Sequence, residues 1–126
     1  MLIKRQLIRQ INSIIELLEK KKFDIKTQYK IIKIKKAIQD EEQIYQEQLQ
    51  LNCEQFFEKD SNNQPIINKD GAFKIKAEKM NECYLLMKQM NSLEVQIPDI
   101  YFTLDELQPL DLTLGELSVL EPFIKN

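Results

Sequence analysis

Two groups of neighbouring carboxylates, Asp40-Glu41-Glu42 and Asp105-Glu106, are the residues of this sequence best suited to acid–base chemistry. Such catalysis needs a carboxyl group whose pKa is shifted by burial or by a charged partner. The first group lies in a long charged segment, where a solvated helix face is the simpler interpretation. The sequence contains no histidine, which is the commonest general base and metal ligand. We therefore expect a protein that is not an enzyme and has no catalytic residues.

The two cysteines, Cys53 and Cys83, are the next candidates for chemistry. Their spacing matches no zinc-finger pattern, and two thiols alone do not complete a tetrahedral zinc site. Cysteine packs as a small apolar side chain, so two buried free thiols are the favoured interpretation. A disulfide between them stays open, because sequence spacing alone does not decide it.

Oxygen-rich and glycine-rich loops give no cofactor site either. The glycines are Gly71 and Gly115, which form no phosphate-binding loop. The segment 60–64 places oxygen-bearing side chains as a calcium loop does, but Pro65 stands where that loop requires glycine. We expect no metal and no cofactor.

Charge is divided unevenly along the chain. Residues 1–36 hold 11 Lys and Arg against 3 Asp and Glu, whereas residues 37–126 hold 7 against 17. The basic part leaves three interpretations open: a solvated face, a site for an acidic protein or for the chain's own acidic tail, or a nucleic-acid contact. Nucleic acid is the less favoured ligand, because few arginines and aromatic residues are present to read bases. The candidate nucleic-acid-binding residues are Lys22, Lys26, Lys30 and Lys33.

The acidic end combines charge with apolar residues. Residues 92–126 hold seven carboxylates and one lysine among many Leu, Ile and Phe. This segment either folds over the helices with its carboxylates outward, or forms a surface that binds a basic protein. The candidate partner-binding residues are Tyr101, Phe102, Asp105, Glu106, Asp111, Glu116, Glu121 and Phe123.

Apolar periodicity predicts a helical hairpin over residues 1–58. Apolar residues recur at helical spacing over about residues 3–22 and again over about residues 27–58. The second helix is much longer than the first, so its C-terminal half must pack on a third helix or on another subunit. A homodimer through this long helix is therefore one alternative.

Shorter elements follow the hairpin. Two apolar runs around Asp70-Gly71 predict a β-hairpin over 64–76, and a third helix is expected over 77–92. An acidic C-terminal segment, 93–126, begins with an alternating pattern typical of a strand. Its residues 102–110 resemble residues 112–120, and each copy has Thr and Glu three apart, as a helix-capping box requires. We predict a single domain over 1–126, mainly α (α+β), ending in short capped helical turns.

Five segments of the chain follow one another in a fixed order: Phe23-Asp24-Ile25-Lys26-Thr27-Gln28-Tyr29-Lys30-Ile31, Glu58-Lys59-Asp60-Ser61-Asn62-Asn63-Gln64-Pro65, Val95-Gln96-Ile97, Leu112-Thr113-Leu114-Gly115-Glu116-Leu117 and Leu120-Glu121-Pro122-Phe123-Ile124. This order resembles a family of small phage and prophage proteins of unknown function from low-GC Gram-positive bacteria. The resemblance implies a viral origin and an accessory role.

We expect a non-enzymatic accessory protein that acts by protein–protein contact, as an inhibitor or adaptor of a host defence or nucleic-acid protein. The partner, of host or phage origin, should be basic. A self-associating virion or assembly component is the alternative, and a nucleic-acid binder is the second alternative. No apolar run is long enough to span a bilayer, so we expect a cytoplasmic protein without membrane contact.

Overall fold

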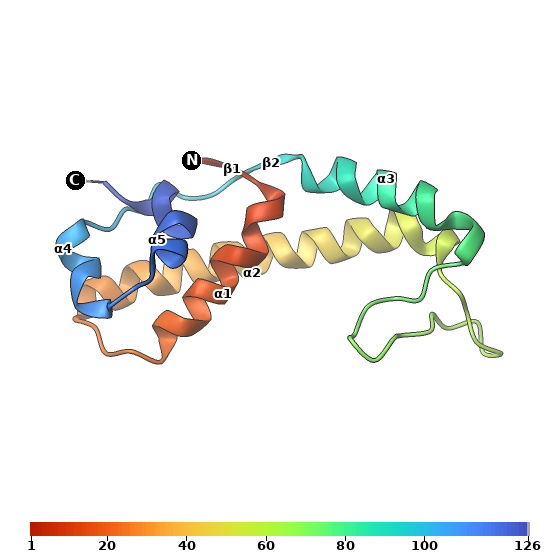
Figure 1. Cartoon of the computed structure of the whole chain (residues 1–126), viewed down its shortest axis with the longest axis horizontal. Helices are drawn as coiled ribbons and strands as arrows, with labels where there is room; N and C mark the ends of the chain where they lie inside the picture. Colours follow the sequence, from red (N-terminus) through yellow and green to blue (C-terminus); the bar gives the residue numbers. More distant parts are fainter. Residues whose placement is uncertain (126) are drawn as a thin grey trace. The chain divides into compact units, whose positions relative to one another are not determined.

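The computed structural model describes residues 1–125 of the chain (Figure 1). Its contacts divide the chain into two compact units: Met1–Gln43 with the described residues from Leu93 onward, and Ile44–Ser92. The single domain expected over 1–126 is thus organised as two units. The predicted boundary between residues 92 and 93 coincides with a boundary between them.

The protein is mainly α-helical, with a small antiparallel β-sheet, as the sequence predicts. Short 3-10 turns extend several helices, at Arg5–Leu7, Glu54–Phe56, Ala77–Lys79, Gln108–Leu110 and Glu121–Phe123. In the described part of the chain, no helix is both long and apolar enough to span a membrane. The helices and strands are β1 (Leu2–Lys4), α1 (Ile8–Glu19), α2 (Ile25–Cys53), α3 (Met80–Asn91), β2 (Glu94–Gln96), α4 (Leu104–Leu107) and α5 (Leu114–Leu120).

Helices α1 and α2 form the predicted antiparallel hairpin. Glu19 at the end of α1 pairs with Lys35, and Arg9 near its start lies 3.8 Å from Glu42. The apolar stripes of both helices bury against each other in the core of the first unit, as amphipathic helices do. The buried isoleucines and leucine of these stripes are Ile8, Ile11, Ile14, Ile15, Leu18, Ile31, Ile34 and Ile38.

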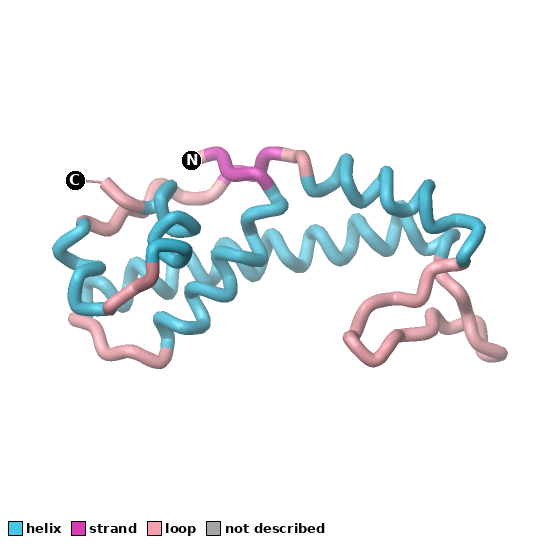
Figure 2. The backbone as a smooth tube through the Cα atoms, viewed as in Figure 1, coloured by secondary structure: helices cyan, strands magenta, loops and turns pink. Residues whose placement is uncertain are grey.

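The prediction of a helix over residues 3–22 is wrong for its first turn. Residues Leu2–Lys4 form strand β1, which pairs antiparallel with β2 so that Ile3 lies opposite Val95 (Figure 2). The backbone N–H of Arg5 then donates to the carbonyl of Leu93 at 2.9 Å. Both Ile3 and Val95 are buried in the core of the first unit, so this pairing holds the start of the chain against that core.

Helix α3 covers the C-terminal half of α2 in the second unit (Figure 1). The sequence left two candidates for packing against the C-terminal half of α2, a third helix or another subunit. The structure shows that the third helix packs there. The buried cluster between them consists of Tyr45, Leu49, Cys53, Phe56, Phe57, Cys83 and Met90.

The segment between α2 and α3 forms bridges but no full strand (Figure 2). Ile67 pairs with Phe73 around the Asp70-Gly71 turn, as the predicted hairpin requires. The hairpin also pairs with residues 57–59, through bridges from Phe57 to Ile75 and from Lys59 to Pro65. Three backbone hydrogen bonds of 2.8–2.9 Å close a ring among Glu58, Ile66 and Lys74. The outcome is a three-segment loop rather than an isolated hairpin.

Candidate functional site

Helices α4 and α5 are both built on the predicted capping boxes. The hydroxyl of Thr103 accepts the backbone N–H of Glu106 at 3.2 Å, and the Glu106 carboxylate accepts the backbone N–H of Thr103 at 3.3 Å. Thr113 and Glu116 make the same pair of hydrogen bonds at the start of α5. Each box satisfies backbone groups that a helix start leaves unpaired, so these two short helices begin at defined residues.

Glu106 also links α4 to α2 through hydrogen bonds of its carboxylate. The ammonium of Lys30 lies 2.9 Å from each Glu106 carboxylate oxygen, and the hydroxyl of Thr27 donates to the same carboxylate at 3.3 Å. Partial burial acts to raise the pKa of Glu106, but the hydrogen bonds from Lys30 and Thr103 outweigh it and lower the pKa. The contact of Lys30 with the chain's own acidic tail, one of the three interpretations of the basic stretch, is therefore present.

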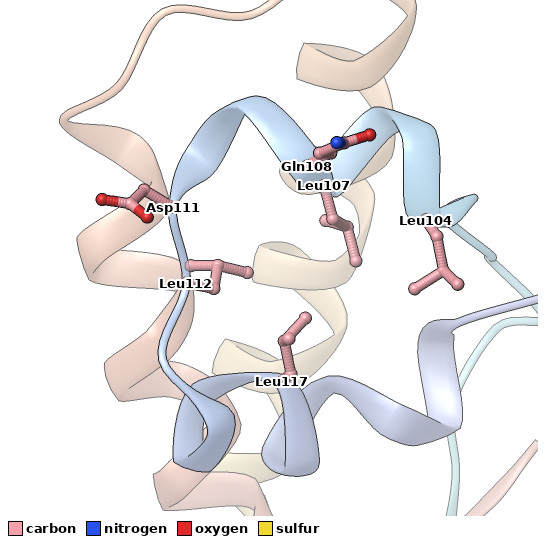
Figure 3. A pocket seen from close by; sticks show the side chains of 6 residues that line it. All are labelled: Leu104, Leu107, Gln108, Asp111, Leu112 and Leu117. Atoms are coloured by element: carbon pink, nitrogen blue, oxygen red, sulfur yellow. The ribbon is translucent and has the colours of Figure 1, made fainter.

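Between α4 and α5 lies a pocket of about 310 Å³, which we call the leucine pocket (Figure 3). In the close-up, the leucine side chains of its wall converge on a common space, whereas the Asp111 carboxylate points away from it. This volume is at the lower end of the range for ligand pockets, and it suits a single large apolar side chain. The lining residues are Leu104, Leu107, Gln108, Asp111, Leu112 and Leu117.

The surroundings of the leucine pocket combine exposed leucine and carboxylate side chains. Leu104 is 48% exposed and Leu114, at the start of α5, is 86% exposed. Asp105 and Asp111 are exposed on the same segment. Complete burial of an exposed leucine by a partner contributes about 1.5–3 kcal/mol, and the half-exposed Leu104 would contribute about half of that.

Asp111 takes an unusual backbone conformation at the mouth of the pocket. Its φ of 54° lies in the left-handed region, where it ends the 3-10 turn Gln108–Leu110. Asp and Asn tolerate this conformation better than most other residues with a Cβ. The turn redirects the chain, so that the Leu112 side chain points into the space between Leu107 and Leu117 (Figure 3).

Two of the predicted partner-binding residues are wrong. Phe102 and Phe123 are fully buried in the core of the first unit, where a partner cannot reach their side chains. The reason is a parallel bridge between Phe102 and Ile124, in which the Phe102 N–H donates to the Phe123 carbonyl at 2.6 Å. This pairing turns both aromatic rings inward.

The other predicted residues of this surface differ in their roles. Asp105, Asp111 and Glu121 are exposed, whereas Glu106 and Glu116 are half-buried parts of the capping boxes. Tyr101 is half-buried, with the ammonium of Lys125 5.1 Å from its ring centroid. The pocket leucines were not predicted, although the similarity of residues 102–110 to 112–120 already pairs Leu104 with Leu114 and Leu107 with Leu117.

The candidate nucleic-acid-binding lysines do not all remain available. Lys22, Lys26 and Lys33 are exposed, but Lys30 is held by Glu106. The ammonium of Lys33 lies 4.8 Å from the ring centroid of Tyr29, in a cation–π contact.

Cys53 and Cys83 are free thiols, both fully buried in the second unit. Burial and the neighbouring thiol of Cys83 raise the pKa of Cys53 to about 11. A thiol with so high a pKa holds little thiolate at neutral pH and is a poor nucleophile or metal ligand.

Two of the carboxylates considered for acid–base or metal chemistry, Glu42 and Asp60, have structural partners. Glu42 of the acidic triplet pairs with Arg9 of α1. Asp60 accepts the backbone N–H groups of Asn62 and Gln64, at 2.9 and 3.0 Å, which makes it a turn-forming residue. Across residues 1–125, no three side chains of the metal-binding types are grouped closely enough to hold an ion.

Comparisons with known proteins give no match: no protein-family model, curated protein or solved structure is similar to this chain.

Proposed function

We propose that this chain is a non-enzymatic protein-binding module whose leucine pocket holds an apolar side chain of a basic partner. The observation that carries the proposal is the pocket of about 310 Å³, whose wall includes the exposed Leu104. The exposed Leu114 lies on α5 three residues before the wall residue Leu117, which places both on one face of that helix. Apolar contact there would supply affinity, and the nearby carboxylates of Asp105 and Asp111 would select a partner rich in Lys or Arg.

The partner in this proposal is a segment of a host or phage protein, and the chain acts on it as an inhibitor or adaptor in the cytoplasm. The viral origin that the sequence resemblance implies is part of this proposal. Self-association through the long helix has less support, because α3 already covers the buried face of the C-terminal half of α2.

A selection from a displayed library of random peptides tests the proposal, because it does not require the partner to be identified first. The full chain should enrich peptides that carry Leu, Ile or Phe next to Lys or Arg. The Leu114→Ser variant should bind these peptides at least about tenfold more weakly, since in the proposal the bound peptide buries the exposed Leu114 next to its apolar anchor.

A matched control variant distinguishes binding at the leucine pocket from nonspecific binding to exposed leucines. Leu51 on α2 is 84% exposed, almost the same as the 86% of Leu114, and it lies in the other unit. Leu51→Ser should leave peptide binding unchanged. Enrichment of peptides without basic residues would contradict the proposed function. So would an equal loss of peptide binding in the Leu114→Ser and Leu51→Ser variants.

A further inference from the structure

The outer face of α2 carries a stripe of exposed apolar side chains that the leucine pocket does not use. Ile25 is 83% exposed, Tyr29 59% and Ile32 50%. At about 100° per residue, their spacing of four and three places them in one row. The buried side of the same part of α2, with Thr27, Ile31 and Ile34, lies opposite this row.

Such a row is unusual, because the solvent side of an amphipathic helix is normally polar. Single exposed apolar residues need no explanation, but three that are consecutive along one face form a continuous surface. Spacing of three and four is the pattern by which one helix packs along another. We call Ile25, Tyr29 and Ile32 the α2 stripe.

A small pocket adjoins the stripe. It has a volume of about 210 Å³ and lies at the turn between α1 and α2. Ile32 belongs both to its wall and to the stripe, and Gln28 lines it from the same helix. The remaining lining residues are Leu18, Glu19, Lys21, Phe23 and Ile31. A side chain projecting from a helix laid along the stripe could enter this space.

The charges around the stripe specify what could cover it. Lys26 and Lys33 follow one edge, and Lys36 continues the row itself one turn beyond Ile32. In residues 1–125, none of the ion pairs found involves Lys26 or Lys36, and both side chains are exposed. Lys26 interacts electrostatically with the carboxylate of Asp24, which precedes the stripe, so Lys36 is the lysine of this pair without such a neighbour among the interactions found in the described part of the chain. A second copy of the stripe would bring these lysines against one another, which is unfavourable.

From the stripe, the pocket and the exposed lysines together, we infer that the N-terminal half of α2 binds an acidic amphipathic helix of another protein. Apolar residues of that helix, three and four apart, lie on the α2 stripe and fill the adjoining pocket. Its Asp and Glu side chains face Lys26, Lys33 and Lys36. With the leucine pocket on the same unit, the chain would join an acidic partner to a basic one.

Designed helical peptides test this inference with the full chain, by fluorescence anisotropy. The probe is a labelled peptide with leucines at alternating spacings of three and four and glutamates elsewhere. Two control peptides are used: one of the same composition in scrambled order, and one with lysine in place of glutamate. We expect the probe to bind at least about tenfold more tightly than either control, because both the row and the charge contribute.

Variants of the chain locate the contact. Ile25→Ser combined with Tyr29→Ser should weaken binding of the probe by about tenfold or more, without loss of the fold, because both side chains are exposed. Lys26→Glu combined with Lys36→Glu should weaken it comparably. The charge-matched control, Lys69→Glu with Lys88→Glu on exposed positions of the other unit, should change it less than about twofold.

Three results would overturn the inference. Equal binding of the scrambled peptide would show simple charge attraction to a solvated lysine face. Tighter binding of labelled DNA, abolished by Lys26→Glu with Lys36→Glu, would indicate a nucleic-acid site. Dimerisation lost in the Ile25→Ser and Tyr29→Ser variant would indicate a second copy. The Leu114→Ser variant should bind the probe normally, so failure of this site and failure of the leucine pocket are distinguishable.

Discussion

Removing the contact between Lys30 and Glu106 should destabilise the first unit, because this contact fastens α4 to α2. The perturbation is a double-mutant cycle of Lys30→Met and Glu106→Gln, in which glutamine keeps the shape that the capping box needs. The side chains of Lys30 and Glu106 are 21% and 23% exposed, and the ammonium lies 2.9 Å from both carboxylate oxygens.

The expected coupling energy follows from this geometry. Fully exposed ion pairs contribute about 0.2–1 kcal/mol, whereas hydrogen bonds to charged groups in a protected site contribute about 1.5–3 kcal/mol. With about a fifth of each side chain exposed, we expect a coupling of about 1.5 kcal/mol. The control cycle is Lys79 and Glu82, 43% and 59% exposed at 3.3 Å, for which we expect about 0.3 kcal/mol.

The assay is urea denaturation of each variant, followed by far-UV circular dichroism at neutral and acidic pH. The pKa of Glu106 is lowered in the folded state, so its contribution to the unfolding free energy is present above the ordinary pKa of about 4.5. It is lost as the pH falls through the lower folded pKa, when the carboxylate becomes protonated. A coupling equal to that of the control pair, or one unchanged at acidic pH, would refute the reasoning.

Three further predictions concern other elements. Thr113→Ala should lower the unfolding free energy by about 1 kcal/mol through loss of the capping hydroxyl, while Thr113→Ser should retain most of it, as measured by urea denaturation. Asp111→Gly should be neutral or slightly stabilising, since glycine adopts a φ of 54° without the cost of a Cβ, whereas Asp111→Val should lower the melting temperature in calorimetry. Burial raises the pKa of Cys53 to about 11 in the folded protein. The contribution of the protonated thiol to the unfolding free energy should therefore be complete below about pH 8.5 and be lost as the pH rises towards the folded pKa. Denaturation titrations should show a smaller decrease of the unfolding free energy at alkaline pH in the Cys53→Ala variant.

Features set by local spacing could be predicted from the sequence. Both capping boxes follow from a threonine and a glutamate three residues apart, and each is present with the expected pair of hydrogen bonds. Helices α2 and α3 also follow, because their apolar residues recur at helical spacing over three or more turns. Both predictions depend only on residues that are close together in the sequence.

Features set by distant pairing could not be predicted. Ile3 fits the apolar stripe of a helix as well as it fits a strand, and its strand partner Val95 lies far away along the sequence. The burial of Phe102 depends likewise on the bridge to Ile124. An aromatic residue in an acidic segment has the same sequence signature whether it meets a partner or the protein's own core.

The leucine pocket falls between these two cases. The similarity of the two segments pairs their leucines, but their convergence depends on the turn at Asp111, which one sequence alone does not reveal.

The most direct test of the leucine pocket is methyl NMR of the full chain with labelled leucines, titrated with the tightest basic peptide from the library selection. We predict shift changes concentrated on the leucines in and beside the pocket, with Leu51 and Leu85 of the other unit unmoved. The leucines expected to respond are Leu104, Leu107, Leu112, Leu114 and Leu117. Shift changes centred on Leu51 and Leu85, or spread evenly over the chain, would contradict the account.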